Sequence, residues 1–271
     1  MRLWVRAGAY DPGVSDIDLS GMWDLNGRVA IVTGASSGFG ARFVRVLRAA
    51  GAEVVAAARR ADRLEALASE VPGVVPFACD VSDDEACAAL VATTLERFGR
   101  IDVLINNAGA SDSPHKAEEE PPEVFRQVIE VNLNACFVLA ALVAPTMLAA
   151  GRGSVINIAS VHSFVGSSPN NQAGYVVSKH GVIGLTRELG LQWARRGVRV
   201  NAIAPGYFAT ELTAEMFVED SSGLGWITRN TPMRRGGTPA ELDGALLFLA
   251  SDASSYVTGQ TITVDGGWTI R

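Results

Sequence analysis

The sequence is poor in the residues that build disulfide frameworks and metal centres. Only three cysteines and three histidines occur among 271 residues. Cys79, Cys87 and Cys136 form no Cys-x-x-Cys pair, and the histidines are widely scattered. Disulfide-rich domains and Cys/His metal sites need a much denser spacing of these residues. We therefore predict neither a disulfide scaffold nor a metal site.

Positive charge and long apolar runs are also scarce. The 23 basic and 29 acidic residues give a net charge of -6, whereas nucleic-acid binding requires Lys and Arg to replace counterions. No apolar run approaches the ~20 residues that span a bilayer. The first residues are interrupted by Arg2 and Arg6 and lack a signal-peptide core, and acidic residues from Asp11 onward disfavour a transit peptide. We expect a cytoplasmic protein with no nucleic-acid or membrane partner.

What the chain does contain is a regular alternation of two periodicities. Hydrophobic residues make up 48% of the sequence, which suffices for a large core. Stretches of helical period, among them Ala41–Ala50, Asp84–Phe98 and Glu123–Leu139, separate short β-branched runs. These runs are Val29–Thr33, Glu53–Ala58, Val74–Ala78, Asp102–Ile105, Ser154–Ile158, Val198–Ile203 and Thr261–Val264.

Strands that are apolar on both faces and alternate with helices are typical of a parallel sheet covered on both sides. We predict an α/β fold: one doubly wound parallel sheet of about seven strands flanked by helices on both faces, in a single domain over residues 28–271. Residues 1–27 show little periodicity and are predicted to form an amino-terminal arm, packed by Trp4 or Trp23.

The first predicted strand runs directly into a glycine-rich turn, Thr33–Gly40, with the sequence TGASSGFG. Glycines allow the backbone to turn tightly and to approach a ligand closely. The start of the following helix offers unpaired N–H groups and a partial positive charge, which suit a pyrophosphate. A purely structural turn is the alternative, but the position after the first strand of a βαβ unit favours a nucleotide.

Further motifs follow in order along the chain. They are Asn106–Gly109 (NNAG) after the fourth strand, Asn132, Ser160 after the fifth strand, Tyr175–Lys179 (YVVSK), and Pro205–Gly206 after the sixth strand. Together with the glycine turn they resemble the short-chain dehydrogenase/reductase family over about residues 28–270. The resemblance implies a Rossmann fold and hydride transfer between a nicotinamide cofactor and a ketone or secondary alcohol.

The resemblance also assigns cofactor contacts to this sequence. They fall on Gly34, Ser36, Ser37, Gly38, Phe39, Gly40, Arg59, Arg60, Asp80, Val81, Asn107, Ala108, Gly109, Tyr175, Lys179, Pro205, Gly206, Phe208 and Thr210. Thr210 is expected to hydrogen-bond the nicotinamide carboxamide. Asp80 is expected to contact the adenine, although it could equally cap the helix that begins near Asp83.

The choice of cofactor depends on the end of the second strand. An acidic residue there would bind the adenosine ribose hydroxyls, but the sequence has Ala58, Arg59 and Arg60. A guanidinium binds a 2′-phosphate that an acid would repel. NADP(H) is therefore favoured, with NAD(H) as the alternative, because the arginines could be merely solvated and Ser37 replaces a basic residue found in many NADP-using relatives.

Tyr175 and Lys179 lie four residues apart, so their side chains share one face of a helix. An ammonium beside a phenol stabilises the phenolate, which makes proton exchange with a carbonyl feasible. Ser160 is assigned to hydrogen-bond the substrate oxygen. It precedes Tyr175 by 15 residues, two more than the family's usual spacing, so Ser163 is a second candidate donor. His162 is expected to have no catalytic duty.

Three further features of the sequence each allow two interpretations. Asn132 fits the family's proton relay, or is a helix amide satisfied by neighbouring backbone. Residues 207–235 suit a mobile lid over the cofactor, or a plain surface excursion. The apolar faces of the helix from Glu123 and of Tyr256–Gly267 match regions that the family buries in a homotetramer, or belong to the core of one chain.

The resemblance implies a small carbonyl or alcohol substrate, of the 3-oxoacyl thioester or keto-sugar acid type, without distinguishing between these types. Three other functions compete with this prediction. An epimerase or dehydratase relative would need a larger carboxyl-terminal domain than 271 residues leave room for. A non-catalytic nucleotide-binding regulator and a scaffold with an idle cofactor site are the other two.

Overall fold

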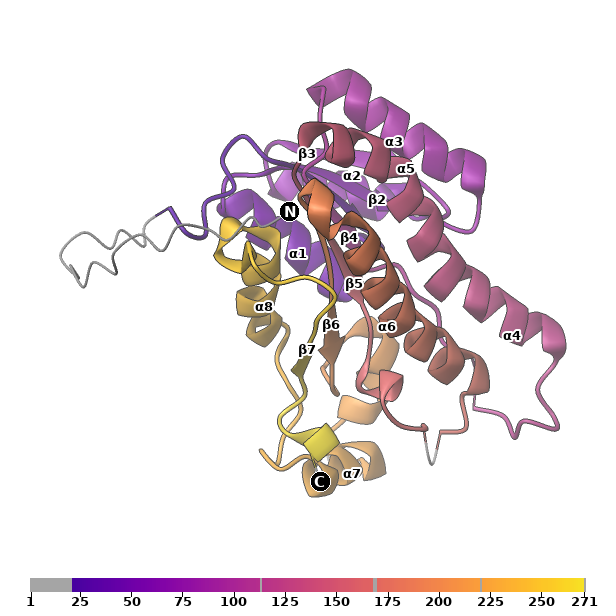
Figure 1. The fold of residues 1–271 in the computed structure, drawn as a ribbon. Helices are drawn as coiled ribbons and strands as arrows, with labels where there is room; N and C mark the ends of the chain where they lie inside the picture. Colours follow the sequence, from indigo (N-terminus) through magenta and orange to yellow (C-terminus); the bar gives the residue numbers. More distant parts are fainter. Residues whose placement is uncertain (1–20, 113, 168–169, 220, 271) are drawn as a thin grey trace, which may run out of the picture.

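The computed structural model describes residues 21–112, 114–167, 170–219 and 221–270 (Figure 1). All neighbouring strands in its seven-stranded sheet pair in parallel, in the order β3-β2-β1-β4-β5-β6-β7. The strands are β1 (Val29–Thr33), β2 (Glu53–Ala58), β3 (Val74–Ala78), β4 (Val103–Asn106), β5 (Gly153–Ile158), β6 (Val198–Pro205) and β7 (Thr261–Val264). The predicted fold class is confirmed.

Helices cover both faces of the sheet (Figure 1). They are α1 (Gly38–Ala49), α2 (Ala61–Glu70), α3 (Asp84–Phe98), α4 (Pro122–Ile129), α5 (Ala135–Ala150), α6 (Ala173–Trp193), α7 (Ser222–Asn230) and α8 (Asp243–Ala250). Side chains of β1 alternate between two cores. Ala30 and Val32 pack with α1, α2 and α8, whereas Ile31 packs with α3, α5 and α6. Burial on both faces explains why the strands read as continuous apolar runs.

The strand order reverses between β1 and β4. The chain first moves outward from β1 to β2 and β3, and then returns to place β4 on the other side of β1. The connections that leave these two strands therefore diverge at the carboxyl edge of the sheet. Such a switch point is where ligands bind in open α/β sheets.

One predicted helix is longer than the sequence pattern suggested and carries an irregular turn. Instead of a helix over Glu123–Leu139, helical structure continues over Pro122–Ala150 through a π-helical segment, η2 (Glu130–Asn134). By length and composition alone, Pro122–Ala150 could cross a membrane, with 39% of its most apolar window buried in the protein. The core helices of soluble proteins can have the same length and apolar composition.

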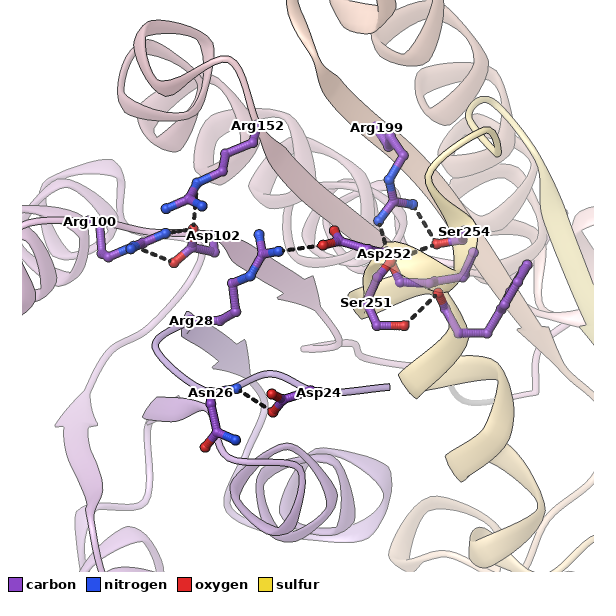
Figure 2. A network of polar contacts seen from close by, with 12 residues as sticks. Asp24, Asn26, Arg28, Arg100, Asp102, Arg152, Arg199, Ser251, Asp252 and Ser254 are labelled. Atoms are coloured by element: carbon purple, nitrogen blue, oxygen red, sulfur yellow. Dashed lines mark hydrogen bonds and ion pairs between the residues drawn. The ribbon is translucent and has the colours of Figure 1, made fainter. Parts of the chain in front are cut away.

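Ion pairs and hydrogen bonds connect charged residues at the opposite, amino edge of the sheet (Figure 2). The buried carboxylate of Asp102 accepts hydrogen bonds from the Val29 N–H at 2.9 Å and from Arg100 Nε at 2.8 Å. Arg28 pairs with Asp252 at 2.8 Å, which links the start of β1 to the end of α8. These contacts connect the residues that begin β1 and β4 with the segment after α8, at the edge of the sheet that lies opposite the carboxyl edge.

Most of the predicted amino-terminal arm, including Trp4, lies outside the described residues. Within residues 21–27, Leu25 is fully buried and its N–H donates to the Ala50 carbonyl at 2.9 Å. The ring of Trp23 lies 6.4 Å from that of Phe248 on α8.

Candidate active site

The glycine turn after β1 is packed too tightly for larger residues. A Cβ on Gly34, whose φ is +64°, would lie 2.8 Å from the Cα of Ala108. A Cβ on Gly40 would lie 2.3 Å from the Gly34 carbonyl oxygen. Ser37 precedes α1 in an extended conformation, and its hydroxyl does not cap the helix. Within the described residues, Ser37 thus leaves the first N–H groups of α1 without a cap from its side chain.

The NNAG motif locks the ends of β1 and β4 together. The Thr33 hydroxyl accepts hydrogen bonds from the N–H groups of Asn107 and Ala108, both at 3.0 Å. The Asn107 side chain donates to the Thr33 carbonyl at 2.8 Å. Asn106 donates at 2.9 Å to Asn157 on β5, its register partner. These bonds fix the backbone at the switch point.

A groove of about 350 Å³ opens at this edge of the sheet. Many predicted cofactor contacts meet there, namely Gly34, Ser36, Ser37, Gly38, Phe39, Arg59, Arg60, Asp80, Val81, Asn107, Ala108, Gly109 and Thr210. Six lining residues were not predicted from the sequence as cofactor contacts, namely Ala58, Cys79, Ala110, Gln127, Val131 and Glu211. Glu211 directly follows Thr210, and its position beside that predicted contact was the only available signal.

Other predicted contacts lie behind the groove rather than in its wall. Gly40 supports the turn from within α1, and Pro205 is the last residue of β6. A Cβ on Gly206 would lie 2.8 Å from the Cα of Asp265. The ring of Phe208 is only 3% exposed and packs edge-on against Phe39, with 5.4 Å between centroids. These residues shape the wall without lining it.

The two arginines after β2 behave differently. Arg59 is exposed, whereas Arg60 donates from Nε to the Ser36 hydroxyl at 3.1 Å and from Nη2 to the Ser37 hydroxyl at 2.8 Å. Arg60 also pairs with both carboxylate oxygens of Glu211, at 3.1 and 3.0 Å. The solvated alternative therefore applies to Arg59 alone.

Asp80 lines the groove and does not cap α3. The cap is Asp83, whose carboxylate accepts from the N–H groups of Glu85 and Ala86. Hydrogen bonds from the hydroxyl and N–H of Ser82, and more weakly the charge of Arg59, lower the pKa of Asp80. The carboxylate is thus held ionised at the groove.

Tyr175 and Lys179 meet on one face of α6, as predicted from their spacing. The Lys179 ammonium lies 5.6 Å from the centroid of the Tyr175 ring. It is 5% exposed and donates to the Ile158 carbonyl at the end of β5, at 2.8 Å. The start of α6 is held by Asp112, which accepts from the N–H groups of Gly174 at 3.0 Å and Tyr175 at 3.3 Å. Sequence analysis missed Asp112 because the cap is distant in sequence.

Ser160 follows β5 and is 6% exposed. Its hydroxyl oxygen accepts from the His162 N–H at 3.1 Å, which leaves its own O–H proton for donation. The Ser163 hydroxyl points back and accepts from the Ser160 N–H at 3.2 Å. The short 3-10 turn Val161–Ser163 packs against α6, which brings Ser160, the residue before this turn, near the helix that carries Tyr175 and Lys179.

His162 occupies a position that the spacing argument did not anticipate. Its imidazole is 5% exposed, and its ring centroid lies 6.2 Å from that of Tyr175. Nε2 lies 3.2 Å from the Tyr207 hydroxyl. Tyr207 in turn packs edge-on against Trp226 at 5.3 Å. Burial lowers the pKa of His162, so the ring is neutral at pH 7.

Asn132 lies in the π-helical segment and is 1% exposed. Its Oδ1 accepts from the Ala110 N–H at 2.7 Å, and its Nδ2 donates to the Ala110 carbonyl at 2.9 Å and to the Ser178 hydroxyl at 3.0 Å. The amide is therefore satisfied by protein groups, largely backbone. A Cβ on Gly109 would lie 3.4 Å from Asn132 Oδ1 and 3.8 Å from Lys179 Nζ, so the three residues adjoin. Single-turn π segments are frequent at functional sites.

The groove fits a dinucleotide. The start of α1 supplies N–H groups for a pyrophosphate, and Gly34 and Gly38 admit its close approach. A guanidinium and two hydroxyls gather at the end of β2, where the adenosine ribose is expected. Lys179 and Tyr175 lie beyond Gly109, at the other end of the groove.

Known proteins that are similar to this chain are named as dehydrogenases and reductases. Residues 34–269 match the family model described as enoyl-(acyl carrier protein) reductase. The chain is 39% identical to the galactitol 2-dehydrogenase (L-tagatose-forming) of Cereibacter sphaeroides, over 94% of this chain and 100% of that one. It is 39% identical to the gluconate 5-dehydrogenase of Gluconobacter oxydans (92% and 97%) and 36% identical to a 3-oxoacyl-[acyl-carrier-protein] reductase of Thermotoga maritima (91% and 99%).

Solved structures agree with the sequence relatives. A putative NAD(P)-dependent gluconate 5-dehydrogenase from Beutenbergia cavernae, with bound NADP, is 41% identical, with a TM-score of 0.85 over 93% of this chain and 100% of that one. A gluconate 5-dehydrogenase from Burkholderia cenocepacia in complex with NADP and tartrate is 36% identical, with a TM-score of 0.85 over 92% and 98%. The chain is therefore an oxidoreductase that acts on CH–OH groups with a nicotinamide cofactor, and it belongs to the short-chain dehydrogenase/reductase family.

Proposed function

We propose that the chain interconverts a secondary alcohol and a ketone on a small polyhydroxylated compound, a sugar alcohol or sugar acid. The observation that carries this proposal is the gathering of Tyr175, Lys179 and Ser160 beside a groove that fits a dinucleotide. A 3-oxoacyl thioester is the second candidate, since one relative is named for that substrate.

In the proposed mechanism, a bound nicotinamide supplies or accepts the hydride. Tyr175 gives its phenolic proton to the substrate oxygen during reduction and takes it back during oxidation. The Ser160 hydroxyl donates to the same oxygen and stabilises its developing negative charge. The Lys179 ammonium is buried and lies 5.6 Å from the centroid of the Tyr175 ring, so its positive charge acts on the residue that exchanges the proton. Asn132 supports the proton relay by holding Ala110 and Ser178 around Lys179.

Polar groups near Tyr175 support a hydroxylated substrate. The His162 ring and the Tyr207 hydroxyl are paired at 3.2 Å, and the centroid of the His162 ring lies 6.2 Å from that of Tyr175, so this polar pair borders the proposed reaction site. The rings of Trp226 and Trp268 pack around them and add an apolar surface. A long acyl chain would have little use for the His162–Tyr207 pair, and two relatives are named for a sugar alcohol and a sugar acid.

NADP(H) is the cofactor that we favour, with NAD(H) as the alternative. Arg60 and the hydroxyls of Ser36 and Ser37 form an anion site at the end of β2. Arg59 adds positive charge at the groove. Two similar solved structures contain NADP. The remaining predicted cofactor contacts, from Gly34 to Thr210, belong to the same proposal.

Three broader features also belong to the proposal. Residues 207–235, which contain α7, act as a lid over the substrate. The chain works as a homotetramer in the cytoplasm. Exposed apolar side chains on α5 and α6 support self-association, and the free state of Cys79, Cys87 and Cys136 is compatible with a reducing compartment.

Replacing Tyr175 with Phe tests the proposed chemistry. The Tyr175→Phe variant should fold and bind cofactor but lose at least about 10²-fold in kcat, the usual contribution of a positioned proton donor. Turnover is measured by nicotinamide absorbance with galactitol, gluconate and a 3-oxoacyl thioester. Tyr256→Phe, which alters a fully exposed tyrosine, is the control. Undiminished turnover by Tyr175→Phe would refute the assignment.

A further inference from the structure

A carboxylate already lies where the 2′-phosphate of NADP is expected to bind. Glu211, at the start of the 3-10 segment η5 (Glu211–Phe217), pairs with Arg60 through both oxygens, at 3.1 and 3.0 Å. Arg63 on α2 approaches the same carboxylate at 3.0 and 3.2 Å. Glu211 itself lines the cofactor groove. The inference drawn from this rests on the proposed function.

The Arg60 anion site, formed by Ser36, Ser37, Arg60 and Arg63, has the composition of a phosphate site. Two guanidinium groups supply forked donors, and Ser36 and Ser37 supply hydroxyls on the glycine turn. Such donors bind carboxylates and phosphates by the same bidentate geometry. A carboxylate and a 2′-phosphate would therefore compete for the same Arg60 donors.

We propose that Glu211 is a specificity-determining residue that competes with the 2′-phosphate of NADP(H) for the Arg60 anion site. NADP(H) must displace the carboxylate from Arg60, whereas NAD(H), which carries no 2′-phosphate, binds without displacing it. Glu211 thereby reduces the preference for NADP(H) that Arg60 would otherwise give.

Glu211 competes with the 2′-phosphate for Arg60 over the whole pH range in which binding would be measured. Hydrogen bonds from Arg60, Ser37 and Arg63 hold the pKa of Glu211 at about 2, so the carboxylate stays ionised. The phosphate has the advantage in charge, since a monoester carries about −1.5 to −2 at pH 7. The pair with Arg60 is also half exposed and correspondingly weak. A 2′-phosphate can therefore displace Glu211, at a cost in affinity.

Two nucleotides that differ only in the 2′-phosphate isolate this effect. Binding of adenosine 2′,5′-bisphosphate and of adenosine 5′-monophosphate to the full chain is measured by titration calorimetry at fixed salt. In Glu211→Gln and Glu211→Ala the affinity for the bisphosphate should rise at least about threefold, an effect within the range of one exposed ion pair. The affinity for the monophosphate should stay within about twofold.

Two further variants show whether the effect depends on Glu211 itself and on the Arg60 anion site. Glu215→Gln changes an exposed carboxylate on the same segment, for which the described residues show no ion pair, and should bind both nucleotides like the wild type. Arg60→Ala should reduce the bisphosphate affinity toward that of the monophosphate, with Arg63, Ser36 and Ser37 as the remaining donors. An unchanged or lowered bisphosphate preference in Glu211→Gln would overturn the inference and leave the proposed function intact. Failure of both nucleotides to bind any variant would overturn both.

Discussion

At the scale of single residues, the buried imidazole of His162 makes the free energy of unfolding depend on pH. Burial lowers its pKa below the usual ~6.5, while the unfolded chain keeps the usual value. Below pH ~6.5 the unfolded state therefore takes up a proton that the folded state does not bind. Stability rises with pH wherever the unfolded state holds more protons. The contribution of His162 is fully present above pH ~6.5 and is lost as the pH falls toward the folded-state value.

Urea unfolding at pH 7.5 and pH 5.5 tests this sign. The wild type should lose more unfolding free energy over this interval than His162→Gln, whose side chain does not titrate but can still hydrogen-bond the Tyr207 hydroxyl. His180→Gln, which alters an exposed histidine on α6, removes only the smallest contribution to the lowered pKa of His162 and should keep most of the wild-type pH dependence. Equal pH dependence in wild type and His162→Gln would show that the ring does not resist protonation.

At the scale of the element, the start of α6 depends on a cap from a distant loop. Asp112 accepts from the N–H groups of Gly174 and Tyr175, whereas the side chain of the local cap residue, Gln172, does not cap the helix. Asp112→Ala should lower the unfolding free energy by about 1 kcal/mol, the usual value of an N-cap. It should also lower kcat more than it raises KM, because the bond to the Tyr175 N–H orients the catalytic residue.

Asp83→Ala provides the matched control for this effect. Asp83 caps α3 in the same way, through the N–H groups of Glu85 and Ala86, but α3 carries no proposed catalytic residue. Chemical unfolding and initial-rate kinetics of both variants separate the two roles. Similar stability losses with a fall in kcat only for Asp112→Ala are expected. If both variants kept wild-type kcat, Asp112 would be a structural cap alone.

The same contrast shows what the sequence could predict. The strands and the glycine turn were predictable because burial on both faces and local spacing leave a direct pattern, and the Tyr175–Lys179 contact follows from helical geometry. The cap by Asp112 and the burial of His162 were not, because both depend on loops brought together by the tertiary fold. The π-helical turn at Asn132 was not predicted either, because a single wide turn inside a long apolar helix changes the sequence pattern only locally.

At the scale of the whole molecule, α5 and α6 present apolar surface that the described part of the chain does not cover. Phe137 on α5 is 52% exposed, at a hollow that is also lined by Leu133, Val138 and Leu185. Glu130 and Glu188 lie at the same hollow. An apolar centre with a charged rim is typical of a protein interface. The part of this surface that includes Phe137 belongs to the helix Pro122–Ala150, whose length and composition alone would suit a membrane. A second copy of the chain is the occupant that we propose.

Light scattering coupled to size exclusion tests this assembly. The wild type should have the mass of four chains of 28.5 kDa. Phe137→Glu should dissociate into smaller species, because a carboxylate buried at an apolar contact has no partner there. Val218→Glu alters another exposed apolar residue, 59% exposed and outside α4–α6, and should keep the wild-type mass. A wild-type mass of one chain, or an undiminished mass for Phe137→Glu, would mean that α5 and α6 do not form the subunit contact.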